Sequence, residues 1–80
     1  MVRLEEEHIN AVDRIIMLAL KKSKRPLSTY QIAKNANLSW STANTHCYKL
    51  KSIGVLHMQR VRNHLGQTKV IWKLLDRKGR

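Results

Sequence analysis

The stretch LSWSTANTHCYKLKSIGVL, residues 38–56, carries the strongest structural signals in this chain. Ser39 is a favourable N-cap residue, and Gly54 is the residue type that most often ends a helix. Between them, small and apolar residues recur at the spacing of a single helix face: Ala43, Cys47, Leu50 and Ile53. This spacing predicts a helix from Ser39 to Gly54 with one narrow apolar side and a broad polar side.

A second short helix is predicted directly upstream. Ser28-Thr-Tyr-Gln31 has the spacing of a capping box, in which each side chain accepts a hydrogen bond from the other residue's backbone N–H. Asn37 tolerates the left-handed conformation that stops a helix, so we expect this helix to end near Asn35. Two short helices joined by such a turn form a helix-turn-helix.

Residues 8–22 are predicted to form a first helix, because apolar residues recur there with helical period. One stripe comprises Ile9, Val12, Ile16, Ala19 and Leu20. Ala11, Ile15 and Leu18 lie roughly opposite, so this helix needs a second surface to pack on. Either a second copy of the chain binds Ile15 and Leu18, giving a homodimer, or the chain's own wing or C-terminus covers them. Pro26 then excludes helix at Arg25, and Leu27 can make a short extended contact.

After Gly54 the apolar period changes to two, which predicts strands at Val55–Arg62 and Lys69–Leu75 around a turn at Gly66. We expect Leu65 and Gly66 at the tip, with His64 facing Gln67. This register separates an apolar face that includes Val61 and Trp72 from a basic face made by Arg60, Arg62, Lys69 and Lys73. A slip of one residue would place Trp72 on the face of Arg60 and Arg62, and we therefore favour the separated register.

The net charge of the chain is strongly positive. Its 80 residues include 16 Lys or Arg and 5 Asp or Glu, which gives +11. From Arg14 to Leu75 there are 12 Lys or Arg and no acidic residue. The usual partner of such a positive field is a polyanion.

The composition excludes several other classes of protein. One Cys cannot form an internal disulfide or a Cys-rich zinc site, and no metal or other cofactor is expected. No apolar run is long enough for a membrane span, and the N-terminus lacks the apolar stretch of a signal peptide. We expect one domain over residues 1–80, with flexible ends at 1–7 and 76–80. We also expect a cytoplasmic protein associated with the nucleoid.

With three helices followed by a two-stranded β wing, the chain resembles winged helix-turn-helix DNA-binding proteins, an α+β fold. Residues 38–56 are similar to the recognition-helix signature of ArsR and MarR-like regulators, and the short chain resembles minimal archaeal or archaeal-virus proteins of this type. The resemblance covers roughly residues 9–75 and rests on Leu38, Ser39, Ser41, Thr42, Ala43, His46, Leu50, Gly54, Val55 and Leu56. It implies binding to double-stranded DNA, transcription regulation and no bound small molecule.

In this family the N-terminal half of the second helix of the motif enters the major groove. The resemblance therefore implies DNA contacts from Ser39, Trp40, Ser41, Thr42, Asn44, Thr45, Tyr48 and Lys49. Asn44 can pair with both N6 and N7 of adenine, and the hydroxyls can donate to phosphates. Lys49 is expected to be a mobile cation. Ser41 and Thr42 can alternatively act only as caps, and Trp40 can either contact DNA or pack on the preceding helix.

The wing is expected to add a second contact, on the neighbouring minor groove or its phosphates. The residues for this contact are Arg60, Arg62, His64, Gln67 and Lys69. The alternative is a solvated hairpin face without a partner.

The sequence leaves alternatives to sequence-specific DNA binding. We expect no enzyme, because no nucleophile, base or carboxylate pair is placed for catalysis, and His46 and Cys47 are adjacent and point about 100° apart on a helix. A sequence-independent DNA-organising protein and a protein–protein module both remain alternatives. So does a domain similar to Zα, which binds left-handed nucleic acid, because Asn44, Tyr48 and Trp72 have that layout. Lys69 and Val70 stand where Zα domains have prolines, and Trp40 stands where they have a Lys.

Overall fold

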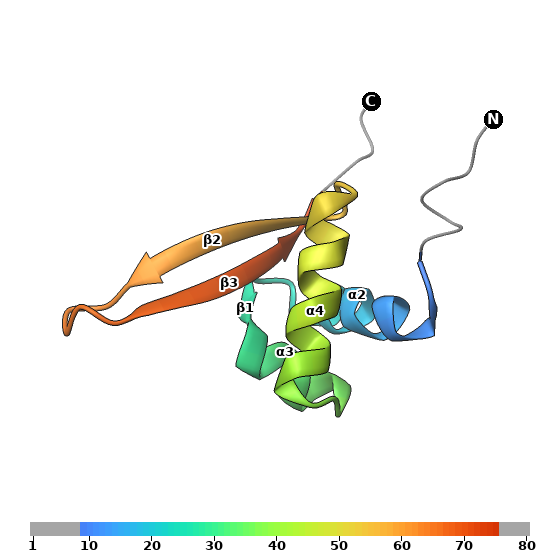
Figure 1. The fold of residues 1–80 in the computed structure, drawn as a ribbon, viewed down its shortest axis with the longest axis horizontal. Helices are drawn as coiled ribbons and strands as arrows, with labels where there is room; N and C mark the ends of the chain where they lie inside the picture. The colour runs from blue at the N-terminus through green and yellow to red at the C-terminus, as the bar shows by residue number, and fades with distance from the viewer. Residues whose placement is uncertain (1–8, 76–80) are drawn as a thin grey trace.

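The computed structural model describes residues 9–75, and Figure 1 shows their arrangement. The helices are α2 (Ala11–Ser23), α3 (Thr29–Ala36) and α4 (Trp40–Ser52), and the strands are β1 (Leu27–Ser28), β2 (Leu56–Arg62) and β3 (Thr68–Leu74). This α+β winged helix-turn-helix confirms the predicted fold class. The ends predicted to be flexible, residues 1–7 and 76–80, lie outside the described residues.

The helix-turn-helix ends are set by the local signals that the sequence predicts. The Gln31 backbone N–H donates to Ser28 Oγ at 3.1 Å, and the Ser28 N–H donates to Gln31 Oε1 at 2.9 Å. Asn37 is left-handed with φ 59°. Ser39 Oγ accepts from the Thr42 N–H at 3.2 Å. Gly54 has φ 84°, which allows the next N–H to bond back into the last turn of α4.

The first helix starts later than predicted. It begins at Ala11, because Asn10 and Asp13 form a capping box in which each side chain accepts the other residue's backbone N–H at 3.0 Å. Ile9 precedes the helix, so the predicted start at residue 8 is wrong. Apolar periodicity continues through Ile9, but the cap decides where helical backbone begins. The helix ends at Ser23, followed by Lys24 in the left-handed conformation with φ 60°.

The three strands form an antiparallel sheet in the order β1-β3-β2. Met58 lies opposite Trp72 and Arg60 lies opposite Val70, so the predicted register is wrong by one residue. Arg60 and Arg62 share a face with Trp72, whereas Lys69 and Lys73 lie on the other face. The sequence analysis had rejected this register because it places Trp72 on the same face as Arg60 and Arg62.

The turn explains the register. The Asn63 N–H donates to the Gln67 carbonyl at 2.9 Å, so Asn63, and not His64, faces Gln67. Asn63 Oδ1 also accepts from the N–H groups of Leu65 and Gln67, at 2.9 and 3.0 Å, and Gly66 takes φ 82°. The side chain of one Asn thus closes a three-residue loop.

The hairpin tolerates this register because only its base packs against the body. Leu56 and Trp72 are fully buried there, while Arg60 and Arg62, on the same face, are exposed further along the strand. Figure 1 shows the hairpin extending well beyond the helices. A strand face that extends beyond the core can change from apolar to basic along its length. The register could therefore not be predicted by assigning all apolar residues to one face and all basic residues to the other.

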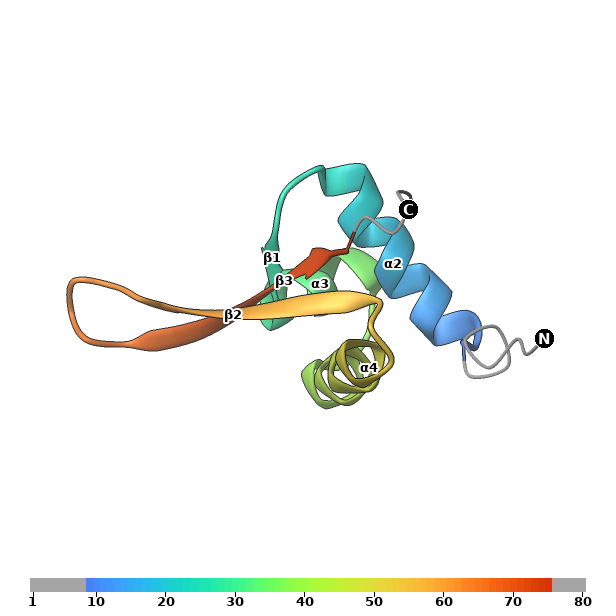
Figure 2. The same cartoon turned by 90° about the horizontal axis from the view of Figure 1, so that it is seen from above.

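The core lies between the three helices and the base of the sheet. Its largest fully buried side chains include Ile16, Ile32, Leu50 and Trp72. The Trp72 indole Nε1–H donates to Thr29 Oγ1 at 2.8 Å, which satisfies the polar atom of the largest core residue. Figure 2 shows the hairpin from above, with α4 on one side and the end of α2 with its connection to β1 on the other.

Candidate nucleic-acid interface

The polar side of α4 is exposed as predicted. Ala43, Cys47 and Leu50 are completely buried and form the core side of the helix. Trp40 is 54% exposed, so it is not a core residue, and its contact with DNA stays a prediction. One and two turns later, Asn44 is half-buried and Tyr48 is 40% exposed.

These α4 residues border an open groove beneath the hairpin, which we call the α4–wing groove. Trp40, Asn44 and Tyr48 follow each other at intervals of four, so they share one face of the helix. The complete lining is Ser28, Thr29, Tyr30, Trp40, Asn44, Tyr48, Thr68, Lys69 and Val70. The groove therefore combines aromatic faces, an amide, hydroxyls and a cation.

A chain of contacts fixes Tyr48 against the sheet. Its ring meets Trp72 edge to face, with ring centroids 5.1 Å apart and planes at 86°. Trp72 is itself held by its hydrogen bond to Thr29. Tyr48 is consequently an exposed aromatic side chain whose position is set by its contact with the core residue Trp72.

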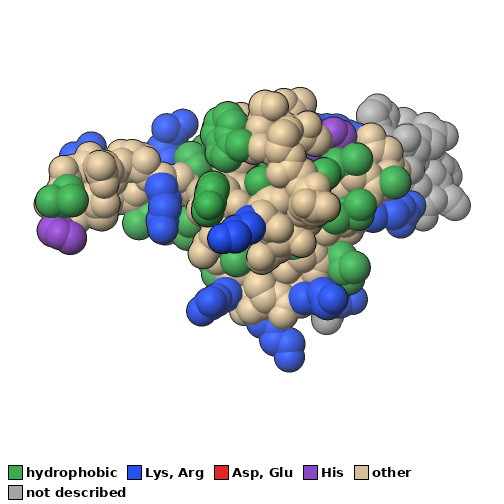
Figure 3. All heavy atoms as spheres, turned by 90° about the horizontal axis from the view of Figure 1, so that it is seen from below, with side chains coloured by type: hydrophobic (Ala, Val, Ile, Leu, Met, Phe, Trp, Pro, Cys, Tyr) green, Lys and Arg blue, Asp and Glu red, His purple; other side chains and the backbone are tan. Residues whose placement is uncertain are grey.

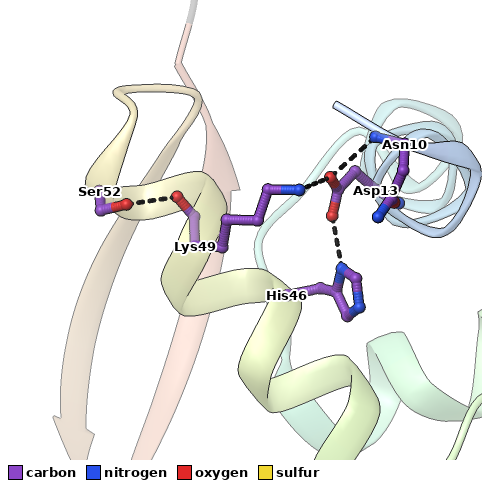
Figure 4. A network of polar contacts seen from close by, with 5 residues as sticks. All are labelled: Asn10, Asp13, His46, Lys49 and Ser52. Atoms are coloured by element: carbon purple, nitrogen blue, oxygen red, sulfur yellow. Dashed lines mark hydrogen bonds and ion pairs between the residues drawn. The ribbon is translucent and has the colours of Figure 1, made fainter. Parts of the chain in front are cut away.

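Figure 4 shows a buried carboxylate that joins α2 to α4. Asp13 is completely buried. Its Oδ1 meets His46 Nδ1 at 2.7 Å, and its Oδ2 accepts from Lys49 Nζ and the Asn10 N–H. Burial by itself would raise the pKa of the Asp13 carboxyl, but the bonds from Lys49, Asn10 and His46 together hold that pKa below its usual range.

This network changes the assignment of Lys49. The prediction of a mobile cation is wrong, because Lys49 is half-buried and bound to Asp13 on the side of α4 that faces α2. His46 is held in the same way, as a packing and pairing residue. The sequence analysis gave Asp13 no role. The available local signal was its position three residues after Asn10, the spacing of a capping box.

The surface that the structure describes exposes no carboxylate. Four of the five acidic residues, Glu5 to Glu7 and Asp76, lie outside residues 9–75, and the fifth is the buried Asp13. Figure 3 accordingly shows Lys and Arg side chains over the wing and the body and no acidic side chain. The positive field inferred from composition is thus a property of the folded surface.

The hydroxyls at the start of α4 divide into two groups. Ser39 Oγ accepts the Thr42 N–H and donates to Thr42 Oγ1 at 2.9 Å, so these two residues are engaged in the cap. Ser41 and Thr45 are exposed. The hydroxyl oxygens of Ser39 and Ser41 are 3.5 Å apart. The cap alternative therefore applies to Thr42, whereas Thr45 has no such role among the described residues. DNA contacts by these side chains stay predictions.

The predicted wing residues are all exposed but do not share one face. Arg60 and Arg62 lie on the α4 side of the hairpin, and Lys69 lies on the other side at the border of the groove. His64 is in the loop, and Gln67 Oε1 accepts from Asn63 Nδ2 at 3.0 Å.

Sequence reasoning missed one aromatic residue of the interface. Tyr30 is 64% exposed and lines the α4–wing groove from the first turn of α3. Lys34 stands over its ring, with Nζ 5.9 Å from the centroid. No local pattern marks Tyr30, because its place beside the groove depends on where the hairpin passes.

The remaining chemically distinctive side chain is Cys47. It is buried, and desolvation, with a smaller contribution from the charge of Asp13, raises the pKa of its thiol to about 12. Within residues 9–75 there is no group of His, Cys, Asp or Glu that could hold a metal ion. The same residues include no helix with the length and apolar character needed to cross a membrane.

Comparison with known proteins supports the fold. No protein-family model and no curated protein sequence matches the chain. Among solved structures, it is similar to a possible transcriptional regulator from Methanosarcina mazei, with a TM-score of 0.73 and 20% identity. The match covers 85% of this chain and 57% of the other, so the chain spans little more than half of that protein. At this identity the likeness shows a shared fold.

Proposed function

We propose that this protein binds double-stranded DNA and regulates transcription, with α4 in the major groove and the β2–β3 hairpin on the adjacent backbone or minor groove. The observation that carries this proposal is the α4–wing groove, whose hydrogen-bonding and aromatic side chains lie on a described surface without carboxylates. The Methanosarcina protein, named as a possible transcriptional regulator, has the same fold and supports a regulatory role.

Each exposed residue has a distinct role in this arrangement. Asn44 reads adenine through its amide, and Trp40 contacts a thymine methyl or a sugar. Ser41 and Thr45 donate to phosphates near the positive end of α4. Arg60 and Arg62 neutralise phosphates under the wing, and His64 and Gln67 near its tip and Lys69 at the border of the groove add further contacts. Ser39 and Thr42 serve mainly as caps, and Lys49 belongs to the Asp13 pair.

We further propose a homodimer through α2 that acts on the nucleoid in the cytoplasm. Ile15 and Leu18 are 44% and 53% exposed, and no other part of the described chain covers them. A two-fold axis at α2 would present two copies of α4. The preferred DNA site would then be an inverted repeat with half-sites about one helical turn apart.

The experiment that tests this function is selection from a pool of random duplexes, scored at two salt concentrations. It reports the preferred site, its symmetry and the ratio of specific to non-specific affinity. Binding through about six phosphates should give a log–log salt slope of roughly −5. A wild-type chain with no affinity for any duplex at low salt would contradict the proposal.

Two substitutions separate base reading from backbone binding. Asn44→Ala should weaken the preferred site by about 1–3 kcal/mol and leave random duplexes almost unchanged. Arg62→Ala, the matched control on the wing, should weaken both kinds of duplex alike. Equal losses for Asn44→Ala on both duplexes would mean that Asn44 reads no base, and would favour a sequence-independent DNA-organising protein.

A second candidate function is favoured by the contact between Tyr48 and Trp72. That contact brings together the Asn44, Tyr48 and Trp72 layout of Zα domains, which bind left-handed nucleic acid. Circular dichroism of an alternating dC-dG duplex tests it. An inverted spectrum on adding the protein supports left-handed binding, and an unchanged right-handed spectrum in the presence of bound protein excludes it.

A further inference from the structure

A second cluster of cations lies away from the α4–wing groove. Lys21 and Lys24 at the end of α2, Arg25 in the following connection and Lys73 of β3 line one open groove. All four residues are exposed, and the remaining lining is Leu20, Pro26 and Leu74. We call this surface the rear basic groove.

The alternation of side chains along β3 places this groove across the sheet from α4. Trp72 packs against Tyr48 of α4. Lys73 is the next residue in the strand, so its side chain points to the opposite face. Figure 2 shows the same division, with α4 on one side of the hairpin and the end of α2 and its connection on the other.

The charge of the rear basic groove is not compensated by the described protein. Asp13 is the one acidic residue of residues 9–75, and it is buried between His46 and Lys49. Cations gathered in one groove repel each other, and this repulsion is relieved when a polyanion replaces the counterions around them. The groove is therefore electrostatically suited to phosphates.

The backbone at Lys24 gives an independent indication. This residue holds the left-handed conformation, with φ 60°. Gly or Asn adopts that conformation with little strain, whereas a long side chain does so at a cost in stability. A Lys at this position keeps a charge at the rim of the groove despite the strain, which is the pattern expected of a binding position.

We propose that the rear basic groove binds a second segment of double-stranded DNA, so that one protein joins two duplexes. The inference rests on the proposed binding of a first duplex at α4. One continuous duplex does not fit both surfaces, because they lie on opposite faces of a molecule 21 Å thick along its shortest axis. The duplex has a persistence length of about 150 base pairs and cannot turn around so thin a body.

The chemistry of the groove suits the DNA backbone. It offers four exposed cations, which can neutralise phosphates, and it lacks the amide, hydroxyl and aromatic side chains of the α4–wing groove. Binding there should be independent of sequence and strongly dependent on salt. The two surfaces would then have different roles: α4 would bind a preferred site, and the rear basic groove would bind a neighbouring duplex of any sequence.

A capture experiment tests the second segment. One duplex carrying the preferred site is fixed to beads, and a labelled duplex of unrelated sequence is added in solution with the full chain. The wild-type protein should retain the labelled duplex on the beads. The triple variant Lys21→Gln, Lys24→Asn and Lys73→Gln should retain at least about ten-fold less, because three phosphate contacts are lost.

The variants are chosen to keep the fold intact. Asn adopts the left-handed conformation of residue 24 at little cost, so Lys24→Asn removes the charge without adding backbone strain. The matched control is Arg14→Gln, Lys22→Gln and Lys51→Gln, which removes the same charge from exposed positions outside the groove. This control should retain the labelled duplex like the wild type. Both variants should bind one duplex in solution within about three-fold of each other.

The outcomes separate the inference from the proposed function. A wild-type chain that binds no duplex at all overturns the function, whereas one that binds the fixed duplex but captures no second one overturns only the inference. Undiminished capture by the groove variant, as bridging by a dimer through α2 would give, also overturns it. The inference is also overturned if the groove variant, unlike the control variant, loses single-duplex binding by the same factor as it loses capture. The rear basic groove would then be part of the surface that binds the first duplex.

Discussion

Replacing Asp13 with Asn tests the buried network that joins α2 to α4. The substitution keeps the shape of the side chain and removes its charge, which leaves Lys49 half-buried without its anion. Removing one partner of a fully buried ion pair costs about 3–5 kcal/mol. Because His46 and Lys49 remain 21% and 31% exposed, water screens part of that cost, and we expect a loss of about 2–3 kcal/mol.

The assay is thermal unfolding followed by circular dichroism at neutral pH. For a domain of this size, 1 kcal/mol corresponds to roughly 4–8 °C, so Tm should fall by about 8–24 °C. Lys49→Gln should also destabilise, by about 1–2 kcal/mol. Lys51→Gln, an exposed position two residues away, is the matched control and should change stability by less than about 0.5 kcal/mol.

The same network predicts how the thermal stability of the protein falls at acidic pH. The folded-state pKa of Asp13 is depressed, so its contribution is complete above the unfolded pKa of about 4 and is lost as pH falls through the folded value. Wild-type Tm should therefore drop on acidification below about pH 4 more steeply than the Tm of Asp13→Asn. The reasoning is refuted if Asp13→Asn costs less than about 1 kcal/mol, or if Lys49→Gln and Lys51→Gln are equally stable.

Two further predictions follow from buried groups. Burial that raises the Cys47 pKa to about 12 should make its thiol unreactive toward a soluble disulfide reagent at pH 8 until the chain is unfolded by denaturant, and rapid labelling of the native protein would contradict this. Trp72→Phe removes the donor to Thr29 in the core and should cost about 2–4 kcal/mol in denaturant unfolding, whereas Tyr48→Phe, which keeps the ring that meets Trp72, should cost less than about 1 kcal/mol.

The sequence by itself determined the features that depend on neighbours within about one helical turn. The capping box of Ser28 and Gln31, the cap at Ser39 and the stops at Asn37 and Gly54 were all predicted, because cap chemistry acts over three or four residues. The buried side of α4 was predicted for the same reason, from spacing alone.

Much of the candidate interface was also available from the sequence. Once the two faces of α4 were assigned, the exposure of Thr45 and Tyr48 and the half-buried position of Asn44 outside the core side agreed with helical period. The exposure of Trp40 did not follow, because a residue in the first turn of a helix can lie over the preceding helix or over solvent. Tyr30 was missed because exposure next to a groove depends on where the hairpin passes.

Only the tertiary structure decided the pairings between distant residues. Asp13 meets residues 33 and 36 positions away in α4, and no local pattern encodes that contact. The hairpin register was decided by the Asn63 side chain, which closes a three-residue loop, and by the short length of strand that reaches the core. Because side chains alternate along a strand, that one-residue difference placed Arg60 and Arg62 on the α4 side of the hairpin, apart from Lys69 and Lys73.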